Sequence, residues 1–210
     1  MDPDLYSPTI QSLSPDDAIV CLSHVRWGYA LDRAQRLMTR FAAERRVYFI
    51  EEPIAHDGPL MLEVTYEDSG VRVVTPRVPR GLGVLRAIDM QRRAIDHLLH
   101  EERVDRYALW YLNAMALPFT RHLEPSLIVY DRTDPLGDFA VATPELVAME
   151  SSLLERADIV YAEAQPEPEP IECCLSGEFE IPSRALAQAF LKALSQERVF
   201  RAATPVHRAA

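Results

Sequence analysis

Residues 18–23 have the sequence AIVCLS, and this short apolar run decides the fold class. An unbroken apolar run is typical of a strand that is covered on both faces, whereas a strand with one solvent-facing side alternates with polar residues. Residues 31–45 follow, and their apolar side chains recur at helical spacing opposite Arg and Glu. A buried strand followed by an amphipathic helix indicates the first unit of a parallel sheet.

The same alternation continues along the chain. Further strands are predicted at residues 46–51, 60–66, 71–75, 107–112, 127–131 and 158–162, and helices at 85–101 and 144–156. Asp68-Ser69-Gly70 supplies turn residues for a hairpin, and residues 118–123 could form one helical turn. The predicted fold is α/β and Rossmann-like: a mostly parallel sheet of about six or seven strands with helices on both faces and residues 18–23 central. We expect the following side chains to be buried: Val20, Leu22, Phe49, Trp110 and Val129.

The pattern indicates a single domain followed by a C-terminal helix. Residues 1–17 form an N-terminal extension, and residues 18–164 form the Rossmann-like domain. Alternating Pro and Glu in residues 165–172 indicates an extended linker, which is expected to span residues 165–182, because such a segment favours neither helix nor central strand. Residues 183–210 are then expected to hold an amphipathic helix and a tail.

Composition excludes some classes of function. The 210 residues carry 32 acidic and 22 basic side chains, a formal net charge of −10, which argues against a non-specific nucleic-acid binder. The three cysteines form neither a disulfide framework nor a metal-ligand spacing, and no metal site is predicted. Neither a signal peptide nor a membrane-spanning segment is recognised, so a cytoplasmic protein is expected.

Ligands of open α/β sheets bind beyond the carboxyl ends of the strands. After the first strand come His24, Arg26 and Trp27, and Arg33 and Gln35 open the helix. Such side chains could stack on a sugar ring or pair with an anionic group. Alternatively, Trp27 closes the core and His24 is a core or capping residue. The segment lacks the G-x-G-x-x-G spacing, which argues against a dinucleotide cofactor and a small nucleotide-binding protein.

Polar residues also follow the later strands. Glu52 comes after the second predicted strand, and Asn113 follows the strand at residues 107–112. Asp131 is the last residue of the strand at 127–131, and Asp134 lies three residues beyond it. Carboxylates at strand ends can act as a general base or hold sugar hydroxyls. Helix caps or solvated turns are the alternative interpretation.

Four stretches resemble a known family: IVCLSHVRW (19–27), RVYFIEEP (46–53), LWYLNAMALPFTRHLEPSLIVYD (109–131) and LLERADIVYAEA (153–164). In order and spacing they are similar to the N-terminal domain of bacterial glycosyltransferases of the two-domain GT-B architecture, most closely those of teichuronic acid biosynthesis. The chain departs from that family at Gly28, where an Asp is usual, and at residues 32–35 and 132–135, which face the expected cleft.

The resemblance implies the acceptor side of a sugar transferase that acts on a cell-envelope glycan or similar acceptor. His24, Arg26, Trp27, Arg33, Gln35, Glu52 and Asn113 would then bind substrate, and Asp131 or Asp134 would be the catalytic base. The resemblance ends near residue 164, so a truncated family member without the nucleotide-sugar half is expected, inactive alone unless a partner chain supplies that half. No cofactor is expected apart from the donor of the complete enzyme. The alternative is a non-catalytic glycan-binding or interaction module that pairs with another transferase.

Overall fold

The computed structural model describes residues 13–14, 16–28, 33–132 and 143–162. The chain divides into two units, residues 1–172 and 173–210, and every described residue belongs to the first. The predicted linker at 165–182 and the C-terminal helix and tail at 183–210 lie outside the described residues, as does most of the N-terminal extension.

One sheet forms the centre of the fold, and every pairing between its described strands is parallel except that of β4 with β5. Strands β5, β2, β1, β6, β7 and β8 follow one another across the sheet, and β5 also pairs in parallel with β3 and antiparallel with β4. The apolar run at the start of the chain is therefore central, as predicted. The strands are β1 (Ala18–Leu22), β2 (Val47–Ile50), β3 (Ile54–His56), β4 (Met61–Tyr66), β5 (Arg72–Pro79), β6 (Tyr107–Tyr111), β7 (Leu127–Arg132) and β8 (Ile159–Ala162).

The short strand β3 was not predicted, and it continues the line of β2 after a break at residues 51–53. Val74 of β5 pairs with both Ile50 of β2 and Val64 of β4, and Arg77 of β5 pairs with both Ile54 of β3 and Met61 of β4. Because a strand residue has only two lateral neighbours, β2 and β3 must lie on the same side of β5. The shift in register between them is that of a β-bulge, a feature that re-aims side chains next to functional sites.

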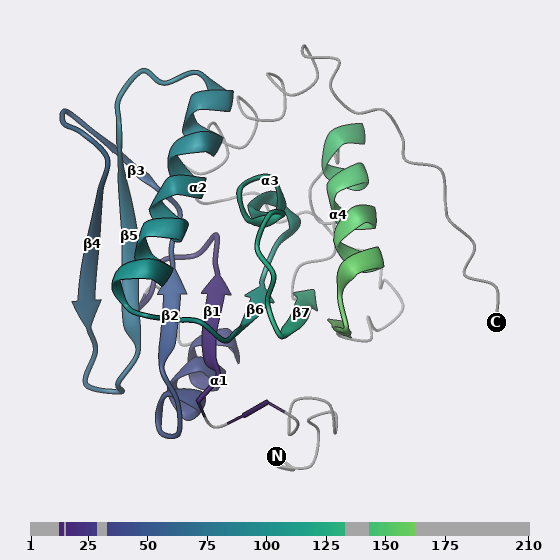
Figure 1. The fold of residues 1–210 in the computed structure, drawn as a ribbon. Helices are drawn as coiled ribbons and strands as arrows, with labels where there is room; N and C mark the ends of the chain where they lie inside the picture. Colours follow the sequence, from purple (N-terminus) through teal and green to yellow (C-terminus); the bar gives the residue numbers. More distant parts are fainter. Residues whose placement is uncertain (1–12, 15, 29–32, 133–142, 163–210) are drawn as a thin grey trace, which may run out of the picture. The chain divides into compact units, whose positions relative to one another are not determined.

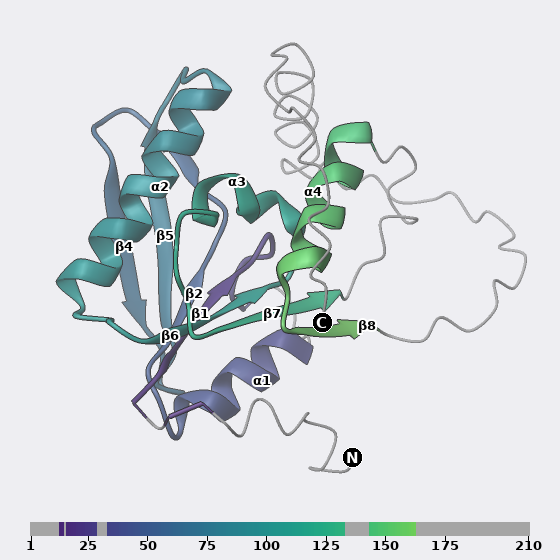
Figure 2. The ribbon, with the colours of Figure 1, turned by 45° about the vertical axis from the view of Figure 1, so that its right-hand side comes forward.

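Helices cover both faces of the sheet, as predicted. Helix α1 (Arg33–Ala42) lies on one face, and α2 (Val84–Glu101), α3 (Leu117–Thr120) and α4 (Pro144–Arg156) lie on the other (Figures 1 and 2). The short 3-10 helix η3 (Ala114–Ala116) leads into α3. Thr143 caps α4, because its hydroxyl accepts a hydrogen bond from the Leu146 amide and Pro144 follows at the first helical position.

The core follows from the unbroken apolar runs. All five residues of β1 and of β6 are buried, since each strand has a helix layer or loop on either side. The five side chains predicted to be buried are at most 1% exposed: Val20, Leu22, Phe49, Trp110 and Val129. Cys21 is buried as well. The face toward α1 holds a continuous apolar cluster that includes Phe49, Trp110 and Met38.

Several boundaries differ from the sequence-based expectation. Within the described residues the sheet has eight strands rather than six or seven, because β3 is a separate element. Strand β5 extends to Pro79 rather than ending at residue 75, since β3 and β4 supply partners for residues 77–79 and 72–77. Helix α1 ends at Ala42 rather than at residue 45. The hairpin is confirmed: Gly70 lies in its turn with φ of 86°, and its amide donates to the Glu67 carbonyl at 2.8 Å.

Candidate functional site

The carboxyl ends of the parallel strands meet at one edge of the sheet, and the topology reverses there. Strand β1 pairs with β2 on one side and with β6 on the other. The chain therefore adds strands first on the β2 side of β1 and then, from β6 onward, on the opposite side. Such a switch point is where α/β sheets bind ligands. The segment that follows β1, residues 23–28, begins there.

Glu51 holds this segment in place. Its carboxylate is 8% exposed and accepts from three groups: the Arg26 guanidinium at 2.6 Å, the Trp27 amide at 2.7 Å and the Thr75 hydroxyl at 2.8 Å. Glu51 directly follows β2, and its amide continues the ladder between β2 and β5 by donating to the Val74 carbonyl at 2.9 Å. Glu51 was not among the residues singled out from the sequence.

Gln35 adds a second contact to the same loop. Its side chain is 3% exposed, and its Nε2 donates to the Arg26 carbonyl at 3.3 Å. Trp27 is partly buried, packs against the apolar cluster and meets Phe49 edge-on, with 5.0 Å between ring centroids. Trp27 therefore contributes to the core, which agrees with the structural alternative for this residue.

Asp131 forms a buried ion pair with the first residue of α1. Its side chain is 0% exposed, and Arg33 Nη1 lies 3.0 Å from its Oδ1. The Arg33 guanidinium also lies over the Tyr161 ring, 5.7 Å from its centroid, and Tyr161 stacks on Trp110. The pair therefore joins the carboxyl end of β7 to α1, and Asp131 has no exposed surface at which to meet a substrate.

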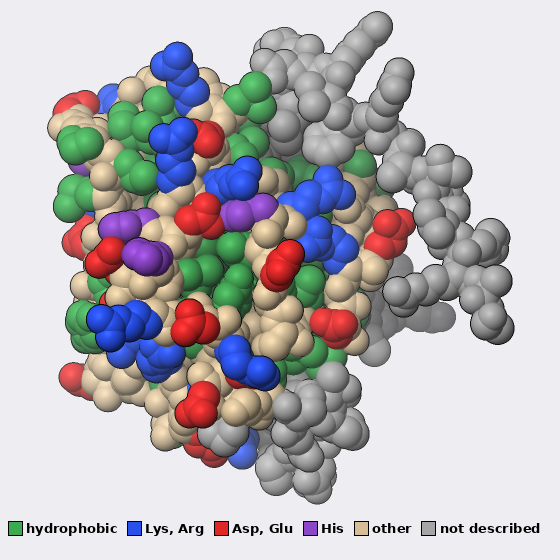
Figure 3. All heavy atoms as spheres, viewed as in Figure 1, with side chains coloured by type: hydrophobic (Ala, Val, Ile, Leu, Met, Phe, Trp, Pro, Cys, Tyr) green, Lys and Arg blue, Asp and Glu red, His purple; other side chains and the backbone are tan. Residues whose placement is uncertain are grey.

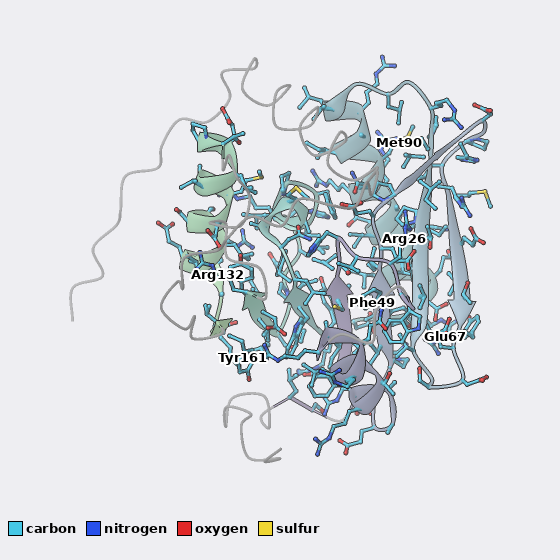
Figure 4. The ribbon with its side chains drawn as sticks, turned by 180° about the vertical axis from the view of Figure 1, so that it is seen from behind. Arg26, Phe49, Glu67, Met90, Arg132 and Tyr161 are labelled. Carbon is cyan, nitrogen blue, oxygen red and sulfur yellow. The ribbon has the colours of Figure 1, made fainter. Side chains whose placement is uncertain are left out.

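A third pair of Arg and carboxylate lies on the other side of β7. Glu150 of α4 is 6% exposed and accepts from Arg132 Nε at 2.8 Å and from the Tyr130 hydroxyl at 2.9 Å. Burial and the neighbouring Glu150 raise the pKa of Tyr130, so the phenol stays protonated and donates. Figure 4 shows Arg26 and Arg132 beyond Phe49 and Tyr161, toward the carboxyl edge.

Glu52 differs from these carboxylates. It is partly buried, yet within the part of the chain that the structure describes it makes no hydrogen bond and no ion pair. Burial raises the pKa of the Glu52 carboxyl, and the nearby Arg26 guanidinium offsets part of that rise. Asn113, in contrast, uses its Oδ1 to cap η3 by accepting from the Met115 amide at 2.9 Å.

The structure thus brings part of the predicted set together. Arg26, Trp27 and Gln35 belong to one contact network around Glu51, and Arg33 and Asp131 form a separate pair. His24 precedes Arg26 on the same loop, and Asp134 lies outside the described residues. Glu51 and Glu150 were missed because a strand-end acid and a mid-helix acid give no sequence signal of the Arg that they will meet.

Three further observations concern the described residues as a whole. Among the described residues, no three His, Cys, Asp or Glu side chains are grouped so that they could hold a metal ion. On the face that carries α2, α3 and α4, basic, acidic and histidine side chains are intermixed (Figure 3). No described helix is both long and apolar enough to cross a membrane.

Fold and site together define a Rossmann-like α/β protein with a polar carboxyl edge at its switch point. No protein-family model matches the chain, and no curated protein does. Among solved structures, the chain is similar to sucrose-phosphate synthase from Thermosynechococcus elongatus, at 13% identity and a TM-score of 0.49, over 69% of this chain and 41% of that one. It is also similar to the E. coli trehalose-6-phosphate structure bound with UDP-2-fluoro glucose, at 15% identity and a TM-score of 0.42, over 90% of this chain and 45% of that one.

The chain spans less than half the length of each of these structures. Both are glycosyltransferases of the GT-B architecture.

Proposed function

We propose that the chain is a glycosyltransferase-like domain that supplies the acceptor side of a sugar transferase. The acceptor would be a cell-envelope glycan or a similar glycan, and the protein would act in the cytoplasm. The observation that carries the proposal is the ordered loop after β1, in which Glu51 fixes Arg26 and the Trp27 backbone at the switch point of the sheet. The sequence resemblance of residues 19–27 and 46–53, the same two segments, supports it.

One observation favours the second candidate, a glycan-binding module without catalysis. Asp131, the described candidate for the base, is fully buried and paired with Arg33. A general base must come within hydrogen-bond reach of the proton that it removes. The remaining candidate, Asp134, would then have to serve as base in a catalytic domain.

Both candidates predict that the isolated chain binds a glycan and transfers no sugar. We expect a pure protein of these 210 residues to bind fragments of cell-envelope glycans on an array and to transfer no sugar from a panel of nucleotide sugars. The reason is that the resemblance assigns most donor contacts to a second domain. Turnover by the pure protein would contradict the expected inactivity, and failure to bind any glycan would overturn the acceptor role.

A further inference from the structure

Glu52 is the one carboxylate at the carboxyl edge that the described fold does not use. Of the nine residues proposed for the site, Arg26, Trp27, Arg33, Gln35, Asn113 and Asp131 all make intramolecular polar or ring contacts. His24 also has a contact, and Asp134 is not described. Glu52 has neither a hydrogen bond nor an ion pair in the described part of the chain.

A carboxylate in this position is costly for the folded chain. Partial removal from water without a compensating hydrogen bond destabilises a charged group. Such uncompensated groups persist where a ligand later satisfies them, at the expense of stability. The neighbouring Glu51 has the opposite character, because three donors satisfy it and it is nearly inaccessible.

Arg26 is the donor that lies near Glu52. Glu51 binds Nη1 of its guanidinium, while 36% of the Arg26 side chain remains exposed. A guanidinium has five N–H donors in a rigid plane, so one fixed nitrogen orients the others. Glu51 is therefore a positioning residue, which sets the direction in which Arg26 presents its remaining donors.

The charges of this group select the kind of ligand. One positive side chain, Arg26, stands against two formally negative ones, Glu51 and Glu52. Arg26 is already neutralised by Glu51 at 2.6 Å, so the group offers no net attraction for a phosphate or carboxylate. His24 on the same loop adds a positive charge only when it is protonated. An uncharged ligand with adjacent hydroxyls fits, because a hydroxyl both donates and accepts.

We propose that Glu52 and Arg26 form a subsite for an uncharged sugar unit of the acceptor, in which Glu52 accepts from one sugar hydroxyl and Arg26 donates to a neighbouring sugar oxygen. This inference rests on the proposed acceptor role. It adds that the bound sugar is uncharged and that Glu52 is the residue that accepts a hydrogen bond from its hydroxyl. Replacement of Glu52 leaves Glu51 and its three donors intact.

Saturation-transfer NMR of the full chain tests the subsite. The probes are the methyl glycosides of glucose, galactose, mannose and N-acetylglucosamine. Each is compared with the matching methyl glycoside of its uronic acid, in which a carboxylate replaces the 6-hydroxymethyl group. We expect at least one neutral glycoside to bind and Glu52→Ala to weaken it by about 10- to 100-fold, the effect of one charge-assisted hydrogen bond. Glu155→Ala, at an exposed position on α4, is the matched control and should bind as the original chain does.

A thermal melt separates a binding role from a structural one. A ligand-facing Glu52 predicts that Glu52→Ala melts at the same temperature as the original chain or higher, whereas a structural Glu52 predicts a lower melting temperature. Neutral-sugar binding that survives Glu52→Ala unchanged would overturn the subsite and leave the acceptor role standing. Stronger binding of a uronide than of its neutral partner would overturn the charge argument. Absence of binding by every probe would count against the acceptor role itself.

Discussion

Glu51 and Glu52 are neighbours in the sequence, yet the fold uses them in opposite ways. Glu51 lies on the α1 side of the sheet, where three donors surround its carboxylate. Glu52 lies near the Arg26 guanidinium, yet its carboxyl is partly buried and makes no hydrogen bond within the described chain.

Removal of the Glu51 carboxylate should destabilise the fold. Glu51→Ala leaves the Trp27 amide and the Thr75 hydroxyl without their acceptor and breaks the ion pair with Arg26. We expect a loss of about 2–4 kcal/mol in the free energy of unfolding, measured with urea. Glu51→Gln should cost less, since the amide oxygen can still accept. The account is wrong about this network if Glu51→Ala unfolds at the same urea concentration as Glu155→Ala.

Glu52 should affect stability with the opposite sign, and only above acidic pH. Its pKa is raised by burial, so the folded chain holds the proton more tightly than the unfolded chain does. Stability is therefore lost as the pH rises from the ordinary pKa of Glu, about 4.3, through the raised value. We expect Glu52→Gln to gain stability relative to the original chain between pH 4 and pH 7. Urea unfolding at both pH values measures the change, and an equal difference at both would contradict a raised pKa.

At the scale of elements, the sequence predicts the sheet well and the site only in part. Unbroken apolar runs predict β1, β6 and β7 and their central place in the sheet. A strand that is covered on both faces needs apolar side chains on both, so its sequence is apolar throughout. The bulge that separates β2 from β3 leaves no such pattern, since residues 51–53 resemble an ordinary turn. The two acids at the end of β2 look alike in the sequence, and only the structure shows that three donors meet Glu51 while Glu52 has no hydrogen bond among the described residues.

The hairpin between β4 and β5 offers a test of element-level reasoning. Gly70 has φ of 86°, a backbone conformation that disfavours any side chain, and an added Cβ would lie 3.4 Å from the Ala42 carbonyl. We expect Gly70→Ala to lower the free energy of unfolding by about 1–2 kcal/mol. Gly83→Ala is the comparison, because Gly83 has φ of −69° and open space around it; although Gly83 is the N-cap of α2, this substitution should cost less than Gly70→Ala. Equal effects of the two substitutions would contradict the turn geometry.

At the scale of the whole molecule, the topology rather than any single motif supports the functional proposal. The chain lacks the Gly-rich phosphate loop of dinucleotide-binding proteins, and its polar side chains gather instead at the carboxyl edge around β1 and β2. The sequence predicted this edge because parallel strands bring their carboxyl ends together. It could not predict which side chains the edge leaves available, because the answer depends on contacts between residues 24 to 98 positions apart.

Amide chemical-shift mapping of the full chain during titration with a neutral methyl glycoside tests the central claim most directly. The account predicts that the perturbed amides cluster in residues 23–28 and 51–53 and in the first turn of α1, and that Glu52→Ala removes most of the perturbation while Glu155→Ala does not. Perturbations confined to the surface of α2, α3 and α4, or none in residues 23–28 and 51–53 while a sugar binds elsewhere, would contradict an acceptor site at the carboxyl edge.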